Sequence, residues 1–216
     1  MTEEQKRELL ELYELRGEEI RNRLLEFKET FQKADDLQIF HELSFCILSS
    51  GVGPKIAGQC MRAIGEKLAE GEEDELLGRI ETIHKYAENA SRYIVFTREY
   101  LKEEHGFLLK SLVSSFEDRV ERRDFFAKNP GIKGLGYMQA SHFLRNLGFS
   151  GYAILDRNNL ASLSELGIIG ETKYPLTKRR YLETESLMTE AAYELGISLD
   201  EFDLLLWSRK RKYVPR

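Results

Sequence analysis

Apolar residues recur every three or four positions along almost the whole chain, and this spacing constrains the fold more than any other feature. It is the period of an amphipathic helix, whereas a half-buried strand needs strict alternation of apolar and polar residues. The spacing predicts helices at 3–30, 36–50, 54–68, 73–83, 86–104, 107–116, 119–128, 137–147, 157–166, 178–195 and 199–208. Only 152–155 favours an extended conformation. We therefore expect an all-α protein without an internal repeat or a linker.

Composition excludes several classes of protein. The chain has 216 residues with only two cysteines, Cys46 and Cys60, which cannot build a disulfide framework. No group of cysteines and histidines has zinc or iron–sulfur spacing, so we expect no metal and no cofactor. No apolar run is long enough to span a membrane, and the charged residues 1–7 do not resemble a signal peptide. These features predict a cytoplasmic protein with no membrane partner.

The charge is unevenly distributed along the chain. A net charge of −5 taken alone argues against a nucleic-acid partner. The excess of acidic residues lies in 1–120, however, whereas 121–216 carries a small excess of lysine and arginine. A basic second half is compatible with a local phosphate-binding face, and equally with ordinary variation along a solvated surface.

The most specific motif is a helical hairpin at about 119–148. Its two helices are joined by a turn that contains Gly131, Gly134 and Gly136, and Gly148 lies where the second helix needs a C-terminal cap. The expected buried face of the second helix is Ala140, Phe143, Leu144 and Leu147. Glycines let the backbone approach a ligand, and the amides that open a helix bind anions such as a DNA phosphate. Lys133 adds a positive charge, so the pattern is typical of a helix-hairpin-helix motif; an ordinary glycine-containing hairpin is the alternative.

Three separated blocks of sequence carry a resemblance to a known family. They are FHELSFCIL at 40–48, KGLG with ASHFLRN within 133–146, and AILDR at 153–157. Together they resemble the type 2 8-oxoguanine DNA glycosylase/lyases of archaea and some bacteria, members of the helix-hairpin-helix, Gly/Pro-Asp DNA glycosylase superfamily. The resemblance runs from about residue 20 to the C-terminus and is loose in 50–120. It implies two helical lobes in a single unit, with the hairpin motif at the cleft.

The resemblance implies a catalytic role for Asp156, which by itself favours the N-cap of the following helix. The nucleophilic lysine of the family falls on Met138, whose thioether cannot form a Schiff base. The family also tends to place histidine two residues after the aspartate, where this chain has Asn158. Met138 is explained either by natural divergence or by a deliberate Lys→Met substitution, and Asn158 favours divergence.

Further site residues follow from the hairpin and from the resemblance. Candidate DNA-binding residues are Gly131, Lys133, Gly134, Gly136, Arg145 and Arg157. Candidate base-pocket residues are Trp207, Arg216, Tyr86 and His142, with Trp207 and Tyr86 as the expected stacking aromatics. Taken without the resemblance, Trp207 favours a place in the core, and the basic run 209–212 is equally explained as a solvated tail.

The resemblance implies a monomeric enzyme of base-excision repair that acts on double-stranded DNA near the nucleoid of a prokaryotic cell. It removes an oxidised purine, 8-oxoguanine above all, by base flipping and Asp-assisted cleavage of the N-glycosidic bond. AP-lyase activity is expected to be weak or absent because the lysine is missing. Two alternatives stay open: a DNA-binding or damage-binding protein that has lost catalysis, and a glycosylase for another base, since residues 49–53 depart from the family's loop.

Overall fold

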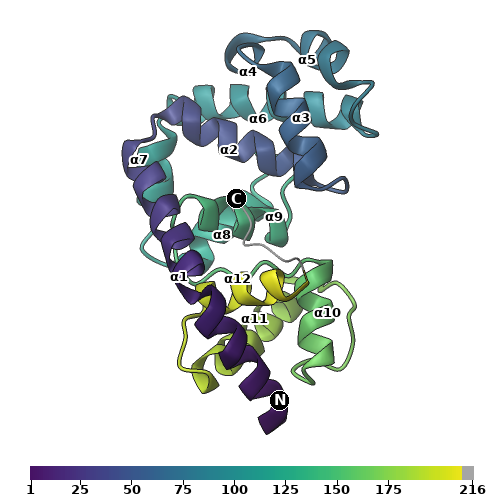
Figure 1. The fold of residues 1–216 in the computed structure, drawn as a ribbon. Helices are drawn as coiled ribbons and strands as arrows, with labels where there is room; N and C mark the ends of the chain where they lie inside the picture. The colour runs from purple at the N-terminus through teal and green to yellow at the C-terminus, as the bar shows by residue number, and fades with distance from the viewer. Residues whose placement is uncertain (211–216) are drawn as a thin grey trace. The chain divides into compact units, whose positions relative to one another are not determined.

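The computed structural model describes residues 1–210, and this part of the chain is all-α, as the periodicity predicts. Its twelve helices are α1 (Glu3–Lys33), α2 (Asp36–Ser49), α3 (Pro54–Ile64), α4 (Lys67–Glu70), α5 (Glu73–Ile80), α6 (Ala87–His105), α7 (Leu109–Ser114), α8 (Arg119–Lys128), α9 (Tyr137–Asn146), α10 (Arg157–Glu165), α11 (Lys178–Glu194) and α12 (Leu199–Lys210) (Figure 1). None of these helices is long and apolar enough to cross a membrane.

The chain divides into two compact units. The first unit comprises Met1–Gln32 and Leu144–Arg216, and the second comprises Lys33–Phe143. Helix α9 therefore begins in the second unit and ends in the first. Each unit has its own buried core, so each is described by itself.

Helix α2 forms the centre of the second unit. It packs against α3, α6 and α7, while α5 packs against α3 and α6 (Figure 1). Because α2 is covered on several sides, its side chains are buried around most of its circumference; they include Ile39, Phe40, Leu43, Cys46, Ile47 and Leu48. Asp35 begins the helix with a capping box, in which its carboxylate accepts from the Gln38 backbone N–H at 2.7 Å. Cys46 is a core residue, as expected.

Helix α12 forms the centre of the first unit, where α10 and α11 pack against it (Figure 1). Its sequence is apolar on most sides and contributes five buried apolar residues, Leu199, Phe202, Leu204, Leu205 and Leu206. Two aspartates, Asp200 and Asp203, are buried on the same helix. Buried carboxylates are rare unless they are hydrogen-bonded or paired, so these two mark a built polar network.

One expectation about local structure was wrong. The helix predicted over 54–68 is two helices, because α3 ends at Gly65, which adopts a φ of +56° that disfavours other residues. The segment 152–155 is buried but forms no strand. Its backbone N–H groups find side chains as acceptors instead: Ala153 donates to Glu185 at 3.1 Å and Ile154 donates to Asp203 at 2.8 Å. Side-chain acceptors therefore replace a partner strand.

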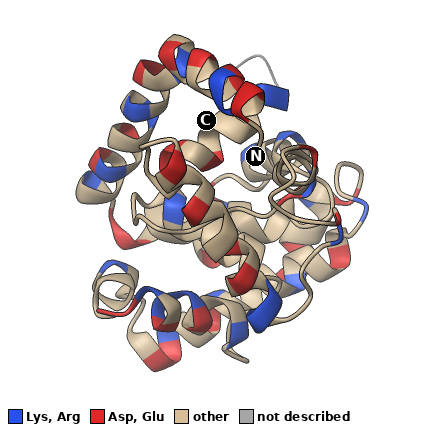
Figure 2. Ribbon diagram, turned by 90° about the horizontal axis from the view of Figure 1, so that it is seen from below, with Lys and Arg blue, Asp and Glu red and all other residues tan. Residues whose placement is uncertain are grey.

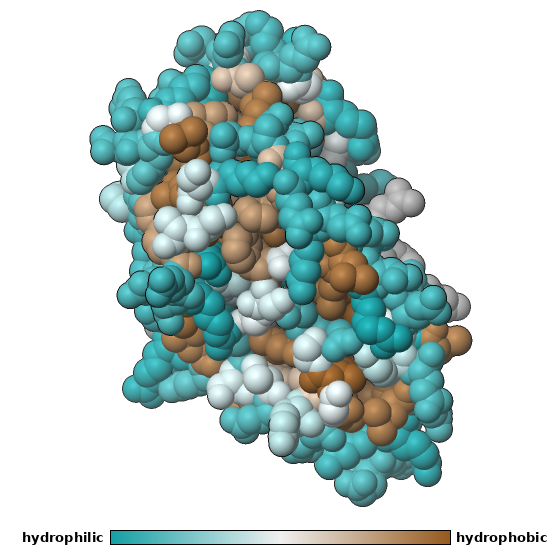
Figure 3. All heavy atoms as spheres, turned by 90° about the vertical axis from the view of Figure 1, so that its left-hand side faces the viewer, coloured by the Kyte–Doolittle hydropathy of each residue, from teal (hydrophilic) through white to brown (hydrophobic). Residues whose placement is uncertain are grey.

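Charged residues of both signs are interspersed along the helices of both units (Figure 2). On the face drawn in Figure 3, hydrophobic residues reach the surface as small groups among hydrophilic ones. The acidic excess of 1–120 and the basic excess of 121–216 therefore do not appear as one acidic and one basic surface on either unit.

Candidate functional site

The hairpin is built from α8 and the first part of α9. The Asp118 carboxylate caps α8 by accepting from the backbone N–H groups of Val120 and Glu121 at 2.7 and 2.8 Å. The two helices pack through the rings of Phe126 and Phe143, whose centroids lie 4.9 Å apart. Both rings are fully buried, so apolar packing between α8 and α9 holds the two helices of the hairpin together.

The turn begins against Tyr100 of α6. Asn129 donates its side-chain amide to the Tyr100 hydroxyl at 2.8 Å and accepts the Gly131 N–H at 2.8 Å. A Cβ at Gly131 would lie 2.3 Å from the Tyr100 ring, which is far inside van der Waals contact. Glycine is therefore required at position 131 by packing within the protein.

The middle of the turn is fixed by α2 and α6. Gly134 has a φ of +81°, and a Cβ there would lie 3.0 Å from both Ile47 and Tyr93. The Lys133 backbone N–H donates to the Thr97 hydroxyl at 3.0 Å, while its ammonium lies 5.4 Å from the centroid of the half-exposed Phe96 ring. Lys133 is thus oriented by a hydrogen bond and a cation–π contact.

Gly136 differs from the other two glycines of the turn. It is exposed, and its Cβ would meet only the end of the Gln139 side chain at 3.6 Å, an ordinary contact. It precedes α9, and its carbonyl accepts the Ala140 N–H at 2.9 Å. Nothing in the described protein excludes a side chain at position 136, so a glycine there keeps the backbone open to a ligand at the start of α9.

Met138 lies in the first turn of α9 and is half-buried. His142, one turn later on the same helix, is also half-buried, and its ring lies 6.3 Å from that of Phe45. A lysine at position 138 would be at the amide end of a helix, next to the exposed Gly136. Position 138 is thus in the first turn of a helix and carries a thioether, where the resemblance implies an amine.

Tyr86 stands beside a hollow of about 180 Å³ within the second unit. The hollow is lined by residues of α2 and the turn that follows it, of α6 and the segment that precedes it, and of the hairpin turn: Ile47, Ser50, Gly51, His84, Tyr86, Asn89, Ala90, Tyr93 and Gly134. The Tyr86 ring is 49% exposed, with the Lys85 ammonium 4.6 Å from its centroid. The second unit therefore brings two predicted site residues, Tyr86 and Gly134, to one concave surface.

His84 is a satisfied structural histidine. Its Nε2 lies 2.9 Å from the Leu48 carbonyl oxygen, and its Nδ1 accepts the Tyr86 backbone N–H at 3.0 Å. These two bonds fix the start of α6 and with it the Tyr86 ring. No group of three or more potential metal ligands occurs within residues 1–210.

Asp156 is the N-cap of α10. One carboxylate oxygen accepts the Asn159 backbone N–H at 2.8 Å, and the residue is half-buried. The following Arg157 is exposed in the first turn of the helix. The partial positive charge of a helix N-terminus favours an ionised carboxylate, so Asp156 is held both by geometry and by electrostatics.

Arg145 lies in the interior of the first unit. It is 5% exposed, and its guanidinium pairs with the Asp203 carboxylate at 3.2 Å and lies 5.4 Å from the centroid of the Phe27 ring. Arg145 was predicted to bind DNA as a residue of the hairpin's second helix. Its burial and its ion pair favour a structural role instead.

The C-terminal candidates are only partly described. Trp207 is half-buried near the end of α12, and Arg216 lies outside the described residues. Of the basic run at 209–212, Arg209 and Lys210 form ion pairs with Glu165. These two residues are therefore anchored on α10 rather than being a solvated tail.

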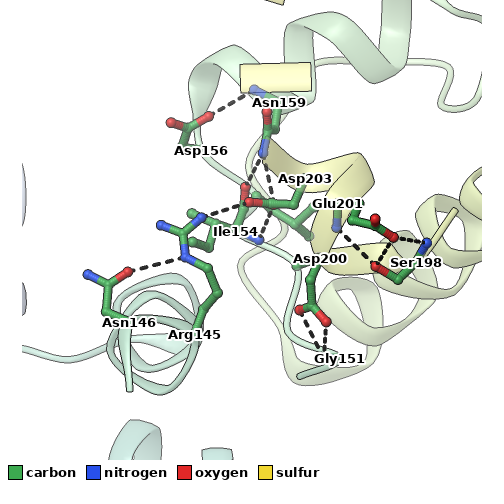
Figure 4. A network of polar contacts seen from close by, with 12 residues as sticks. Arg145, Asn146, Gly151, Ile154, Asp156, Asn159, Ser198, Asp200, Glu201 and Asp203 are labelled. Carbon is green, nitrogen blue, oxygen red and sulfur yellow. Dashed lines mark hydrogen bonds and ion pairs between the residues drawn. The ribbon is translucent and has the colours of Figure 1, made fainter. Parts of the chain in front are cut away.

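Two buried aspartates of the first unit, Asp200 and Asp203, were not expected from the sequence. Asp200 accepts the Gly151 N–H with both carboxylate oxygens, at 3.0 and 3.1 Å, and Asp203 accepts from Ile154 and Asn159 (Figure 4). The signal was present in the sequence, because Asp200 and Asp203, three positions apart, lie together with Glu201 among the apolar residues of 199–207. Such a pair is a candidate for buried hydrogen-bond acceptors.

Comparisons with known proteins identify the family. The family model described as 8-oxoguanine DNA glycosylase matches residues 20–197. The chain belongs to the 8-oxoguanine DNA glycosylase family. The resemblance inferred from three blocks of sequence is thereby confirmed.

Relatives from both prokaryotic domains align with nearly the whole chain. An 8-oxoguanine DNA glycosylase/AP lyase of Korarchaeum cryptofilum is 34% identical over 189 residues, which are 87% of this chain and 86% of the relative. One of Fusobacterium nucleatum is 34% identical over 206 residues, covering 94% of each chain. The crystal structure of the Methanocaldococcus jannaschii 8-oxoguanine glycosylase/lyase in complex with a 15mer DNA containing 8-oxoguanine has a TM-score of 0.85 and 31% identity. It covers 96% of this chain and 99% of that one.

Proposed function

We propose that this protein is a base-excision repair glycosylase that binds double-stranded DNA and removes an oxidised purine, with 8-oxoguanine as the preferred base. The observation that carries the proposal is Asp156, an acidic N-cap at the start of α10 in a chain that aligns along most of its length with glycosylases of this specificity. The prokaryotic relatives further favour action on chromosomal DNA in the cytoplasm.

The proposed reaction needs only DNA, water and the carboxylate. The damaged nucleotide is flipped out of the helix, which costs a few kcal/mol of stacking and pairing that contacts in the protein recover. Asp156 stabilises the positive charge that develops on the deoxyribose as the C1′–N9 bond breaks, and it accepts a proton from the attacking water. The water oxygen bonds to C1′, the base leaves with the electron pair of the broken bond and takes up a proton at N9, and an abasic site remains in an intact strand.

The proposed DNA contacts follow from the hairpin. The exposed Gly136 and the amides that open α9 are available to a backbone phosphate, and Lys133 adds a positive charge held on Phe96. Tyr86 and Trp207 are the proposed stacking aromatics, with about 1–3 kcal/mol for each stacked base. His142, Arg157 and the C-terminal Arg216 complete the proposed set.

We also propose that the enzyme does not cut the strand after base release. β-Elimination needs an amine that forms a Schiff base with the opened sugar, and Met138 offers a thioether instead. Superfamily members that rely on an aspartate and water alone release the base without this step. Loss of the lysine is therefore compatible with a glycosylase that leaves abasic sites.

A duplex with one 8-oxoguanine, assayed before and after alkali, tests the proposal. A monofunctional glycosylase gives strand breaks only after alkali, because alkali cleaves the abasic sites that it leaves. Strand cleavage without alkali, together with borohydride trapping of the protein on DNA, would show that another amine acts as the nucleophile.

The missing amine also favours a second candidate, a damage-binding protein without catalysis. The two candidates differ in what Asp156 does. If the wild type releases no base from a panel of oxidised, alkylated and deaminated duplexes but binds one of them tightly, the binding protein is the correct assignment. Release of a base other than 8-oxoguanine from the same panel would instead assign a changed specificity.

A further inference from the structure

The buried carboxylate of Asp203 lies behind the N-cap that carries Asp156, in the first unit. One of its oxygens accepts the Ile154 backbone N–H at 2.8 Å and the Asn159 side-chain amide at 2.9 Å. The other oxygen accepts from Arg145 at 3.2 Å. Asp203 is 1% exposed. Its three hydrogen-bond donors are therefore protein groups, and they come from α9, from the segment before α10 and from α10 itself.

Two of these three donors flank Asp156 in the chain. Ile154 precedes it by two residues and Asn159 follows it by three. The Asn159 amide also donates to the Ile154 carbonyl oxygen at 3.0 Å, and the Asp156 backbone N–H donates to that same oxygen at 2.9 Å. The turn that presents Asp156 is thus closed by bonds that meet at Asp203 and Asn159 (Figure 4).

The third donor ties this turn to the hairpin helix. Arg145 is on the last turn of α9, and its Nε lies 3.2 Å from the side-chain oxygen of the adjacent Asn146. A buried carboxylate is costly unless it is paired and hydrogen-bonded, and removal of one partner of such a pair is strongly destabilising. We therefore interpret the hydrogen bonds of Asp203 as fixing the positions of Ile154, Asn159 and Arg145, rather than as adding to the stability of the fold.

We propose that Asp203 is a positioning residue for Asp156: together with Asn159 and Arg145 it fixes the turn that holds the Asp156 carboxylate in its reactive orientation. The inference rests on the proposed function, because the orientation matters only where Asp156 acts on a sugar. Misplacement of a catalytic group by about 1 Å costs on the order of 10²-fold in rate. Loss of the network is therefore expected to slow chemistry and to leave DNA binding intact.

Asp203→Asn tests this role. Asparagine preserves the shape and one oxygen acceptor, but it turns an N–H₂ group toward Arg145 or toward the donors at Ile154 and Asn159. We expect the single-turnover rate constant of base release to fall about 10- to 100-fold, with the dissociation constant for the lesion duplex within about twofold of the wild type.

Asp200→Asn is the matched control. Asp200 is also a buried acidic residue of α12, but it binds the Gly151 N–H and makes no bond to Ile154 or Asn159. We expect this variant to keep the wild-type rate constant of base release. An equal loss in Asp200→Asn and Asp203→Asn, or an Asp203→Asn rate within about twofold of the wild type, would overturn the proposal.

Asn159→Ala covers the case in which Asp203→Asn fails to fold. It removes the side-chain bridge but keeps the backbone N–H that Asp156 accepts. We expect the same slow base release with unchanged DNA binding. Where both single variants fold, the double variant should release base no more slowly than the slower single variant, because the effects of substitutions within one network are not additive. Full activity of Asn159→Ala would contradict the proposal.

Hydrogen exchange separates this inference from the proposed function. If the wild type releases no base, the proposed function is wrong. The hydrogen-exchange rate of the Asn159 backbone amide still measures how firmly its hydrogen bond to Asp156 is held. Asp203→Asn should speed exchange at that amide, and Asp200→Asn should not. Unchanged protection of that amide in Asp203→Asn would overturn the positioning role.

Discussion

Asn159 donates to two carboxylates at once, with its backbone N–H to Asp156 at 2.8 Å and its side-chain amide to Asp203 at 2.9 Å. The first bond caps α10, and the second joins that cap to the buried centre of the first unit. The sequence pattern identifies Asp156 only as an N-cap. In the structure, Asn159 links Asp156 to the hydrogen bonds of Asp203. The cap and the proposed catalytic function of Asp156 therefore depend on the same atoms.

Asp156→Asn should separate the cap from the chemistry. Asparagine caps helices about as well as aspartate does, so we expect unchanged thermal unfolding and unchanged binding to an 8-oxoguanine duplex. Base release should fall by roughly 10²- to 10⁴-fold, because the amide carries no negative charge and accepts no proton. Single-turnover release with alkali development measures the rate. Asp156→Ala should in addition lose about 1 kcal/mol of stability with the cap.

Met138→Lys should introduce the missing amine. The position is in the first turn of α9, and methionine and lysine have similar length and linearity. We expect the variant to be trapped on lesion DNA by borohydride and to cut the strand without alkali, because a lysine there forms a Schiff base with the sugar.

Gln139→Lys is the matched control for this gain of function. It adds the same amine one position along the same helix, about 100° around its axis. Trapping by both variants would mean that any nearby amine suffices and that position 138 has no special alignment. Trapping by neither would contradict the assignment of Met138 to the nucleophile position.

The glycines of the hairpin turn should differ in what they tolerate. Gly134→Ala introduces a Cβ at a φ of +81° and within 3.0 Å of Ile47 and Tyr93. We expect it to lose at least about 1 kcal/mol of unfolding free energy from the backbone conformation alone. Gly136→Ala should keep the wild-type stability, because its Cβ would meet only the end of Gln139, and should weaken DNA binding, because its Cβ would lie where we propose that a phosphate approaches. Urea unfolding and fluorescence anisotropy with a labelled duplex measure the two effects, and a destabilised Gly136→Ala would contradict this division.

The helices were predictable because their signals are local. The period of apolar residues predicts the helices, and aspartate caps at Asp35, Asp118 and Asp156 fix where α2, α8 and α10 begin. The boundary at Gly65 was missed because a helical period continues across it, and only the backbone conformation interrupts it.

The sequence predicts the local geometry at the hairpin glycines and at the Asp156 N-cap, whereas it does not predict contacts between residues that are distant in the chain. Arg145 was assigned to the DNA-binding residues because it is on the second helix of the hairpin. Its partner Asp203 is distant in sequence, and the ion pair between them buries the guanidinium. No local pattern contains that information.

The last prediction concerns pH and follows from the burial of Asp203. Desolvation raises the pKa of Asp203 from the ordinary 3.8 to about 7, although the Arg145 guanidinium acts against the shift. The folded protein therefore retains a proton that the unfolded chain has lost, and stability from this group declines as pH rises from about 4 to about 7. The slope is at most about 1.4 kcal/mol per pH unit. Urea unfolding of the wild type and of Asp203→Asn between pH 5 and 8 measures it, because asparagine does not titrate. The difference in unfolding free energy, wild type minus variant, should decrease up to about pH 7 and then level off; a constant difference would contradict the raised pKa.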